Sequence, residues 1–159
     1  MASERRVPMR ILAIGAHPDD IEAGCGGTLL KYAQKGHRIF LMVMTAGDKG
    51  GSSGIRKREQ ARAAKQLGVE KIFWGGYKDT AVPMGLDVIQ KIERVVQDVQ
   101  PHFIFSHYHD DTHQENAMPL LGILEQCSSA PSFNIVRMRA DGQNSHRLST
   151  IVRHPVPLA

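Results

Sequence analysis

A histidine and two aspartates stand close together near the start of the chain, in the segment Ala16-His-Pro-Asp-Asp20. His17 and Asp20 are three residues apart, so one helical turn would bring both side chains to the same side. Asp19 projects differently, which leaves it free for another role. An imidazole beside a carboxylate suits zinc, and a catalytic zinc keeps one position open for water. An aspartate that caps a helix N-terminus would give the same spacing, so this segment alone leaves both interpretations open.

Two further polar segments, at residues 45–51 and 106–116, follow stretches that the sequence predicts to be strands. In an open parallel sheet the ligand crevice lies beyond the carboxyl ends of the strands, where all three polar segments would meet. A dinucleotide site would need a G-x-G-x-x-G pattern in the first loop. That loop instead carries Asp19 and Asp20, which would repel a phosphate, so a cation fits it better.

The predicted elements alternate along the first two thirds of the chain. Apolar runs predict strands at residues 10–15, 38–44, 71–74 and 102–105, and helical spacing predicts helices at residues 20–34, 56–67 and 86–99. Gly36, Gly68 and Pro101 stand where these helices should end. This order predicts an α/β fold with a mainly parallel sheet. A further helix is expected at residues 117–127, whereas residues 127–159 have no clean period and predict an irregular tail.

Length and composition favour one globular domain that covers residues 1–159, since 42% of 159 residues are hydrophobic. No run of 18 apolar residues predicts a membrane span, and no secretory signal is recognisable. Cys25 and Cys127 form no disulfide framework, so a cytoplasmic location is expected. Most of the net charge of +4 lies in the tail, because residues 128–159 hold four arginines and only one aspartate. This charge is too scattered to predict a nucleic-acid partner.

The opening motif has a recognisable family pattern. Ala-His-Pro-Asp-Asp with Glu22, followed by Gly-Cys-Gly-Gly-Thr-Leu, resembles the start of the PIG-L/LmbE-like zinc-dependent N-acetylglucosaminyl deacetylases. The resemblance covers residues 9–116 and continues through Thr45-Ala-Gly-Asp48, the helix with Arg56 and Glu59, then Asp79 and Asp111-Thr-His-Gln-Glu115. It implies a Rossmann-like three-layer fold and a small N-acetylated sugar or glycoconjugate as the substrate.

The resemblance also implies a role for individual residues. His17 and Asp20 would bind zinc or another divalent metal, and Asp19 would be the general base. His113 would stabilise the tetrahedral oxyanion or protonate the leaving amine. Arg56 and Asp79 are candidates for substrate binding, although the spacing of Arg56 and Glu59 also predicts an ion pair within the helix. The chemistry is coherent, because zinc acidifies a coordinated water and polarises an amide carbonyl.

One expected metal ligand is missing. The later family motif reads H-x-D-H, whereas this chain reads His113-Gln-Glu-Asn116, so Asn116 stands at the third ligand position. An amide oxygen is a weak ligand beside imidazole. His113 is the first substitute, and His107 or His109 could serve instead. Two interpretations therefore stay open, an active zinc-dependent deacetylase and a metal-poor remnant of that fold that acts as a binding module or has no activity.

The resemblance to the family pattern ends abruptly near Glu115 and Asn116. Residues 117–159 do not resemble the family continuation, which predicts an incomplete C-terminal part of the fold. Our hypothesis is that the chain is truncated and shifted out of its ancestral reading frame there. The alternative is a diverged tail from which His146 or His154 reaches the site. An unfinished sheet leaves an uncovered edge or apolar face, so a homo-oligomer is expected.

Overall fold

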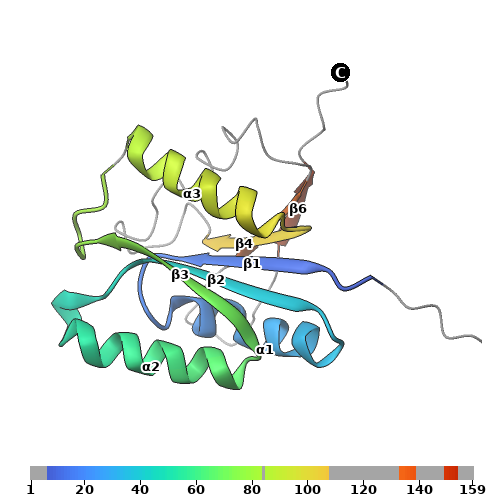
Figure 1. Ribbon diagram of the computed structural model, residues 1–159, viewed down its shortest axis with the longest axis horizontal. Coiled ribbons are helices and arrows are strands. Elements are labelled where there is room, and N and C mark those ends of the chain that lie inside the picture. Colours follow the sequence, from blue (N-terminus) through green and yellow to red (C-terminus); the bar gives the residue numbers. More distant parts are fainter. Residues whose placement is uncertain (1–6, 84, 108–132, 139–148, 154–159) are drawn as a thin grey trace, which may run out of the picture.

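A single six-stranded sheet forms the centre of the protein (Figure 1). The computed structural model describes residues 7–83, 85–107, 133–138 and 149–153. The strands are β1 (Arg10–Gly15), β2 (Arg38–Thr45), β3 (Val69–Tyr77), β4 (Phe103–His107), β5 (Asn134–Met138) and β6 (Ser149–Arg153). The helices are α1 (Asp20–Gln34), α2 (Ser53–Gln66) and α3 (Leu86–Val99), with a short 3-10 turn η1 (Asp48–Gly50).

The strand order is β3-β2-β1-β4-β5-β6, in which only the β5–β6 pair is antiparallel. The chain first builds outward from β1 to β3 and then returns to place β4 on the other side of β1. This reversal makes the gap beyond the carboxyl ends of β1 and β4 a topological switch point, the usual ligand site of such sheets. Of the three predicted polar segments, residues 16–20 and 106–116 come at these strand ends, and residues 45–51 come at the end of β2.

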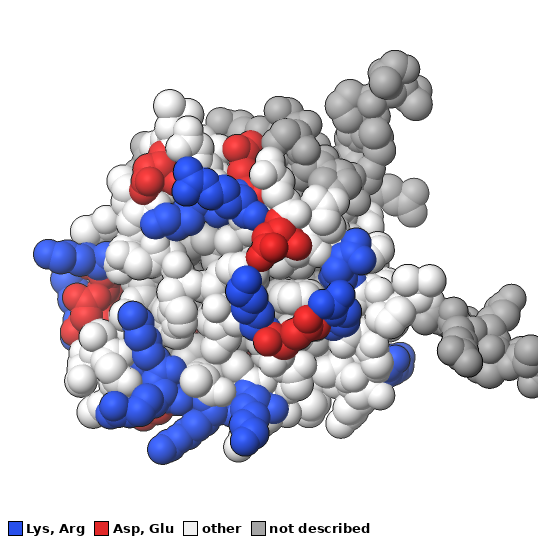
Figure 2. Space-filling view, viewed as in Figure 1, with Lys and Arg blue, Asp and Glu red and all other residues white. Residues whose placement is uncertain are grey.

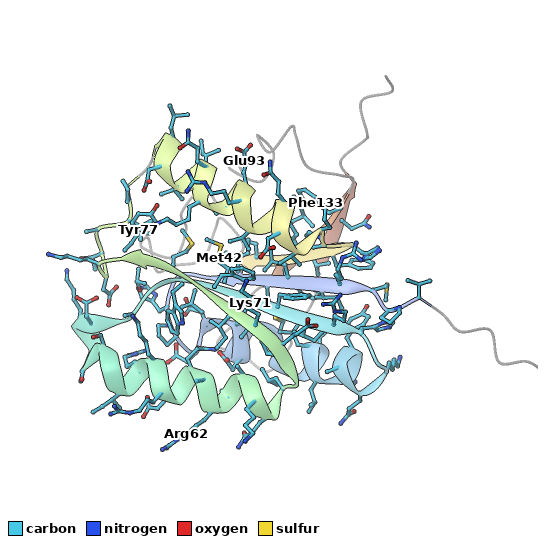
Figure 3. The ribbon with its side chains drawn as sticks, in the orientation of Figure 1. Met42, Arg62, Lys71, Tyr77, Glu93 and Phe133 are labelled. Carbon is cyan, nitrogen blue, oxygen red and sulfur yellow. The ribbon has the colours of Figure 1, made fainter. Side chains whose placement is uncertain are left out.

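Helices cover both faces of the sheet and make three layers. Helix α3 lies on one face, and α1 and α2 lie on the other (Figure 1). Each face has its own apolar core, with Met42 and Ile92 on the α3 side and Leu29 and Leu41 on the α1 side. Figure 3 shows Met42 between the sheet and α3, and Arg62 of α2 at the opposite surface. Since β1 and β2 bury side chains on both faces, they read as continuous apolar runs.

Charged side chains of both signs alternate over much of the visible surface, while basic ones gather over α2 (Figure 2). The exposed basic residues of α2 are Lys57, Arg58, Arg62 and Lys65. None of the helices in the described part of the chain is both long and apolar enough to cross a membrane.

The α/β fold with a mainly parallel sheet is confirmed, and α1 and α3 have the predicted bounds. The prediction of an irregular tail is wrong for β5 and β6. Strand β5 was missed because its apolar stretch is very short, yet Ile135 and Val136 are buried beside β4. The helix predicted at residues 117–127 lies outside the described residues.

A β-bulge shapes the end of β3 next to the switch point. Gly75 and Gly76 stand together opposite Met44, between the pairs Val43–Trp74 and Thr45–Tyr77. A Cβ atom on Gly75 would lie 2.5 Å from the carbonyl oxygen of Met44, so this close approach of two backbones requires glycine.

We therefore expect Gly75→Ala to lower the free energy of unfolding by about 1–3 kcal/mol, the usual cost of overpacking. Urea denaturation measures the change. Gly54→Ala is the control, because its Cβ would meet nothing closer than the Ser52 hydroxyl at 3.9 Å. Equal stability of the wild type and Gly75→Ala would contradict the close approach.

Candidate functional site

The turn after β1 brings His17 and Asp20 together. The carbonyl oxygen of Ala16 accepts hydrogen bonds from the Thr45 backbone N–H at 2.9 Å and from the Thr45 hydroxyl at 3.0 Å. The His17 backbone N–H donates to Asp20 Oδ2 at 2.7 Å, and His17 Nδ1 lies 3.5 Å from the same oxygen. Imidazole and carboxylate therefore lie side by side, as the spacing predicted.

The other ring nitrogen of His17 contacts Asp79, which follows β3. The distance from His17 Nε2 to Asp79 Oδ1 is 2.6 Å, and the Asp79 side chain is only 9% exposed. Two backbone contacts fix this carboxylate: Asp79 N–H donates to Asp48 Oδ1 at 3.0 Å, and Lys49 N–H donates to Asp79 Oδ2 at 3.3 Å. The backbone hydrogen bond from Asp79 lowers the pKa of Asp48. Both oxygens of Asp79 are thus engaged inside the protein.

Two carboxylates make His17 unusually basic. The hydrogen bond to Asp20, then its charge and the Asp79 contact, raise the pKa of His17 to about 9, although burial acts in the opposite direction. In the absence of a metal the ring therefore carries a proton on both nitrogens at neutral pH. This proton is the charge that a bound cation would replace at Nδ1.

Asp19 presents an exposed carboxylate at the start of α1. Its carbonyl accepts the Ala23 N–H at 2.9 Å, but its side chain makes no capping hydrogen bond and is 77% exposed. The helix-cap interpretation therefore does not account for the Asp19 carboxylate. Partial burial raises the pKa of Asp19 and the charge of Arg56 opposes this shift, which surrounding water also screens.

Arg56 of α2 reaches back to this turn. Its Nη2 donates to the carbonyl oxygen of Pro18 at 3.0 Å and to Asp19 Oδ2 at 3.3 Å. The ion pair of Arg56 is thus with Asp19, not with Glu59 as the helical spacing suggested. Gly47 and Gly50 make room for the guanidinium group, since a Cβ atom on either would lie within 3 Å of an Arg56 nitrogen.

Gln60 and Glu22 belong to the same network, and sequence reasoning gave them no role. Gln60 Oε1 accepts the backbone N–H of Asp19 at 3.0 Å, and Gln60 Nε2 donates to Glu22 Oε1 at 2.5 Å. Gln60 is only 3% exposed. The available signal was its spacing, because Gln60 follows Arg56 by four residues and precedes the buried Ala64 by four.

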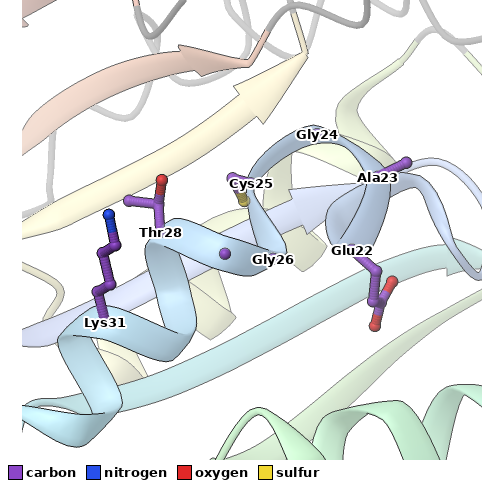
Figure 4. A pocket seen from close by; sticks show the side chains of 8 residues that line it. Glu22, Ala23, Gly24, Cys25, Gly26, Thr28 and Lys31 are labelled. Atoms are coloured by element: carbon purple, nitrogen blue, oxygen red, sulfur yellow. The ribbon is translucent and has the colours of Figure 1, made fainter. Parts of the chain in front are cut away.

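Within the described part of the chain, two hollows lie beside these residues. One of about 320 Å³ is lined by Pro18, Asp19, Glu22, Arg56, Glu59, Gln60 and Ala63. The other, of about 620 Å³, lies along α1 between Glu22 and Lys31, where the helix carries Gly24, Gly26 and Gly27 (Figure 4). Cys25 of this stretch is buried, and burial raises the pKa of its thiol, as expected for a small apolar side chain.

His17 and Asp20 fit a metal ion as two of its ligands. Asp79 is the kind of carboxylate partner that commonly fixes the second nitrogen of a metal-bound histidine. Within residues 7–83, 85–107, 133–138 and 149–153, no group of three or more His, Cys, Asp or Glu is arranged to hold a metal. His113 and Asn116, the residues predicted to complete the site, lie outside these ranges, as do His109, His146 and His154.

Comparison with known proteins gives a family match over most of the chain. The model of the family "PIG-L: GlcNAc-PI de-N-acetylase" matches residues 12–117. Uncharacterized deacetylase YaiS of Escherichia coli is 36% identical over 130 residues, which cover 77% of this chain and 70% of YaiS. Diacetylchitobiose deacetylase of Thermococcus kodakarensis is 31% identical over 104 residues, which cover 60% of this chain and 39% of that enzyme.

Solved structures share the fold at lower identity. N,N'-diacetylchitobiose deacetylase from Pyrococcus horikoshii superposes with a TM-score of 0.72 at 23% identity, covering 80% of this chain and 59% of that chain. The 4-carboxy-2-hydroxymuconate hydratase from Pseudomonas putida gives 0.71 at 17% identity, covering 81% and 65%. Because a hydratase and a deacetylase match equally well, these likenesses establish the fold alone.

In the metal-free protein we expect His17 to stay protonated up to a pH of about 9. The folded pKa lies above the unfolded value, so the stabilisation is complete below pH 6.5 and is lost as the pH rises through about 9. NMR titration of the His17 ring and thermal unfolding at several pH values measure both effects.

Asp79→Asn should lower the pKa of His17, whereas Asp98→Asn removes an exposed carboxylate that pairs with Lys71 and should leave it unchanged. A wild-type His17 that titrates near its ordinary value of 6.5 would contradict the two contacts.

Proposed function

We propose that this chain, which belongs to the PIG-L family of de-N-acetylases, is a zinc-dependent hydrolase of N-acetylglucosamine-type substrates. The reaction is hydrolysis of the acetamide, which yields acetate and a free amine. One observation carries the proposal: the His17–Asp20 pair lies at the carboxyl end of β1, beside the carboxylate of Asp19, which makes no capping hydrogen bond to α1. The names of the matched deacetylases support the substrate class, although the chain spans only 39% of the diacetylchitobiose enzyme.

The proposed metal ligands are His17 and Asp20, with the third from the position of Asn116 or from His113 in its place. Zinc held there would polarise the amide carbonyl and acidify a water molecule. Asp79 supports this arrangement by accepting the Nε2 proton of His17 at 2.6 Å, so Nδ1, which lies beside Asp20, would be the nitrogen that binds the metal after losing its own proton. Asp79 is thus proposed to act through His17 rather than by direct contact with the substrate.

Asp19 is proposed as the general base. Its exposed carboxylate would take a proton from the attacking water, and the amine nitrogen would receive a proton from Asp19 or from His113 as the C–N bond breaks. Such a step typically contributes about 10²–10⁴-fold to the rate. Arg56, 3.3 Å from Asp19 Oδ2, favours the ionised carboxylate that a base requires. Arg56 also lines the smaller hollow, which supports its proposed contact with the sugar. His113 is proposed to stabilise the oxyanion or protonate the leaving amine.

A second candidate is a metal-poor remnant of the family fold that binds a ligand without turnover. Asn116 favours it, because a neutral amide oxygen is a poor replacement for the third imidazole. The two candidates make different predictions for metal affinity.

We expect calorimetric titration of the metal-stripped protein to show one tight zinc site per chain, which His17→Ala abolishes. Asn116→His should bind zinc more tightly than the wild type, because imidazole replaces the amide. Weak or absent binding by the wild type, together with strong binding by Asn116→His, would overturn the proposal and favour the remnant.

In a zinc-loaded protein that deacetylates diacetylchitobiose, Asp19→Asn should lower kcat by about 10²–10⁴-fold, because asparagine cannot accept the proton. Zinc stoichiometry should not change, since Asp19 is not a proposed ligand. Asp98→Asn serves as a control of equal charge change. If kcat of Asp19→Asn stayed within a few-fold of the wild type, Asp19 would not be the base.

A further inference from the structure

The backbone of Asp19 adopts a conformation that its neighbours must hold in place. Its φ and ψ of 85° and −24° lie in the left-handed region, which non-glycine residues adopt only when the surroundings impose it. Its carbonyl oxygen receives the N–H of Ala23 in the first turn of α1. The N–H group of Asp19 has no helical partner and must find an acceptor elsewhere.

Gln60 supplies that acceptor from the neighbouring helix. A backbone N–H can only donate, so the Gln60 atom 3.0 Å from it must be the oxygen Oε1. The amide nitrogen of Gln60 then has to face Glu22, and it donates to Glu22 Oε1. Without an acceptor at position 22, the buried amide nitrogen of Gln60 would lose its hydrogen-bond partner, and the side chain would have to move to regain one. Glu22 therefore stabilises the orientation in which Gln60 can hold Asp19.

The contacts reach Asp19 from two sides. Gln60 holds the backbone N–H, while Arg56 holds the carboxylate and the carbonyl oxygen of the preceding Pro18. Both residues come from one face of α2, one turn apart. Because Gln60 is almost fully buried, its contact is shielded from water, whereas the Asp19 carboxylate stays exposed for chemistry.

We propose that Gln60, oriented by Glu22, is a positioning residue that fixes the backbone of Asp19 and so aims its carboxylate. The consequence for catalysis rests on the proposed function, but the effect on the Asp19 backbone does not. A displacement of about 1 Å at a catalytic group can cost as much as 10²-fold in rate, so such an anchor matters to a general base.

Four variants test the anchor. Gln60→Met keeps the length of the side chain and removes its acceptor. Glu22→Gln keeps an oxygen that can accept from Gln60, whereas Glu22→Met does not. Gln66→Met makes the same change as Gln60→Met at an exposed position of α2 and is the matched control.

Hydrogen exchange of the Asp19 amide, followed by NMR in the metal-free protein, is the first measurement. Exchange should be faster than in the wild type by about fivefold or more in Gln60→Met and Glu22→Met, as for the loss of one hydrogen bond. Exchange should be unchanged in Glu22→Gln and Gln66→Met. The chemical shifts of Asp19 should report an altered backbone in Gln60→Met and Glu22→Met only. Unchanged exchange in both Gln60→Met and Glu22→Met would overturn the proposal. If Gln60→Met does not fold, the contrast between the two Glu22 variants decides alone.

Kinetics of the zinc-loaded protein are the second measurement. Gln60→Met and Glu22→Met should lower kcat by about 10–100-fold with KM and zinc affinity unchanged, and Glu22→Gln should restore kcat. A higher KM together with lower zinc affinity and lower thermal stability would indicate a general structural role and overturn the positioning role. A wild type without turnover would contradict the proposed function, while the exchange data would still decide whether Gln60 holds Asp19.

Discussion

The contact between His17 and Asp79 joins the loops that follow β1 and β3, and the rest of the site is arranged around it. Strand β2 lies between β1 and β3 in the sheet, so the loops that follow β1 and β3 have to converge beyond the end of β2 for this contact to form. The bulge at Gly75 and Gly76 bends the last part of β3. The two hydrogen bonds between Asp79 and the residues of η1 then fix the position of the Asp79 carboxylate. Since His17 and Asp20 share one turn, holding the ring from behind also sets the direction in which Nδ1 faces Asp20.

Helix α2 contributes to the site without carrying any of the proposed metal ligands. Its inward face presents Arg56 and Gln60 to the turn before α1, and these two side chains contact Pro18 and Asp19. A left-handed aspartate at a helix start is costly, so it persists only where several contacts act on it together. The helix thereby stabilises a local conformation that the segment Pro18-Asp19-Asp20 would rarely adopt alone. Stability of the helix layer and geometry of the site are coupled through these contacts.

The sequence predicted those features that depend on neighbours along the chain. The bounds of α1 and α3 followed from helical spacing and from Gly36 and Pro101, which act locally. The pairing of His17 with Asp20 followed from a separation of three residues. The contact with Asp79, by contrast, spans 62 positions and depends on strand register and on a bulge, which no local pattern encodes. Gln60 is a polar residue on a buried helix face, and its role becomes visible only when α1 and α2 are packed together.

Strands β5 and β6 were also beyond prediction from local sequence patterns. Their apolar stretches are too short to establish a period, and they are stabilised by pairing with a sheet that already exists. The prediction failed there because the information lies in β4, not in the tail itself. The family match likewise ends at residue 117, before β5 begins.

The balance of charge at the site explains why a cation is expected there. Asp20 and Asp79 contact a single imidazole and Asp19 follows in the same turn, and in the metal-free protein the second proton of His17 and the guanidinium of Arg56 offset these carboxylates. A divalent cation between His17 and Asp20 would displace that proton and supply more charge in its place. The raised pKa of His17 and the proposed metal site are therefore two consequences of one arrangement of carboxylates. The same argument bears on position 116 as the proposed third ligand position, because an imidazole there would add a strong ligand without adding another negative charge, whereas the amide of Asn116 would add neither charge nor much affinity.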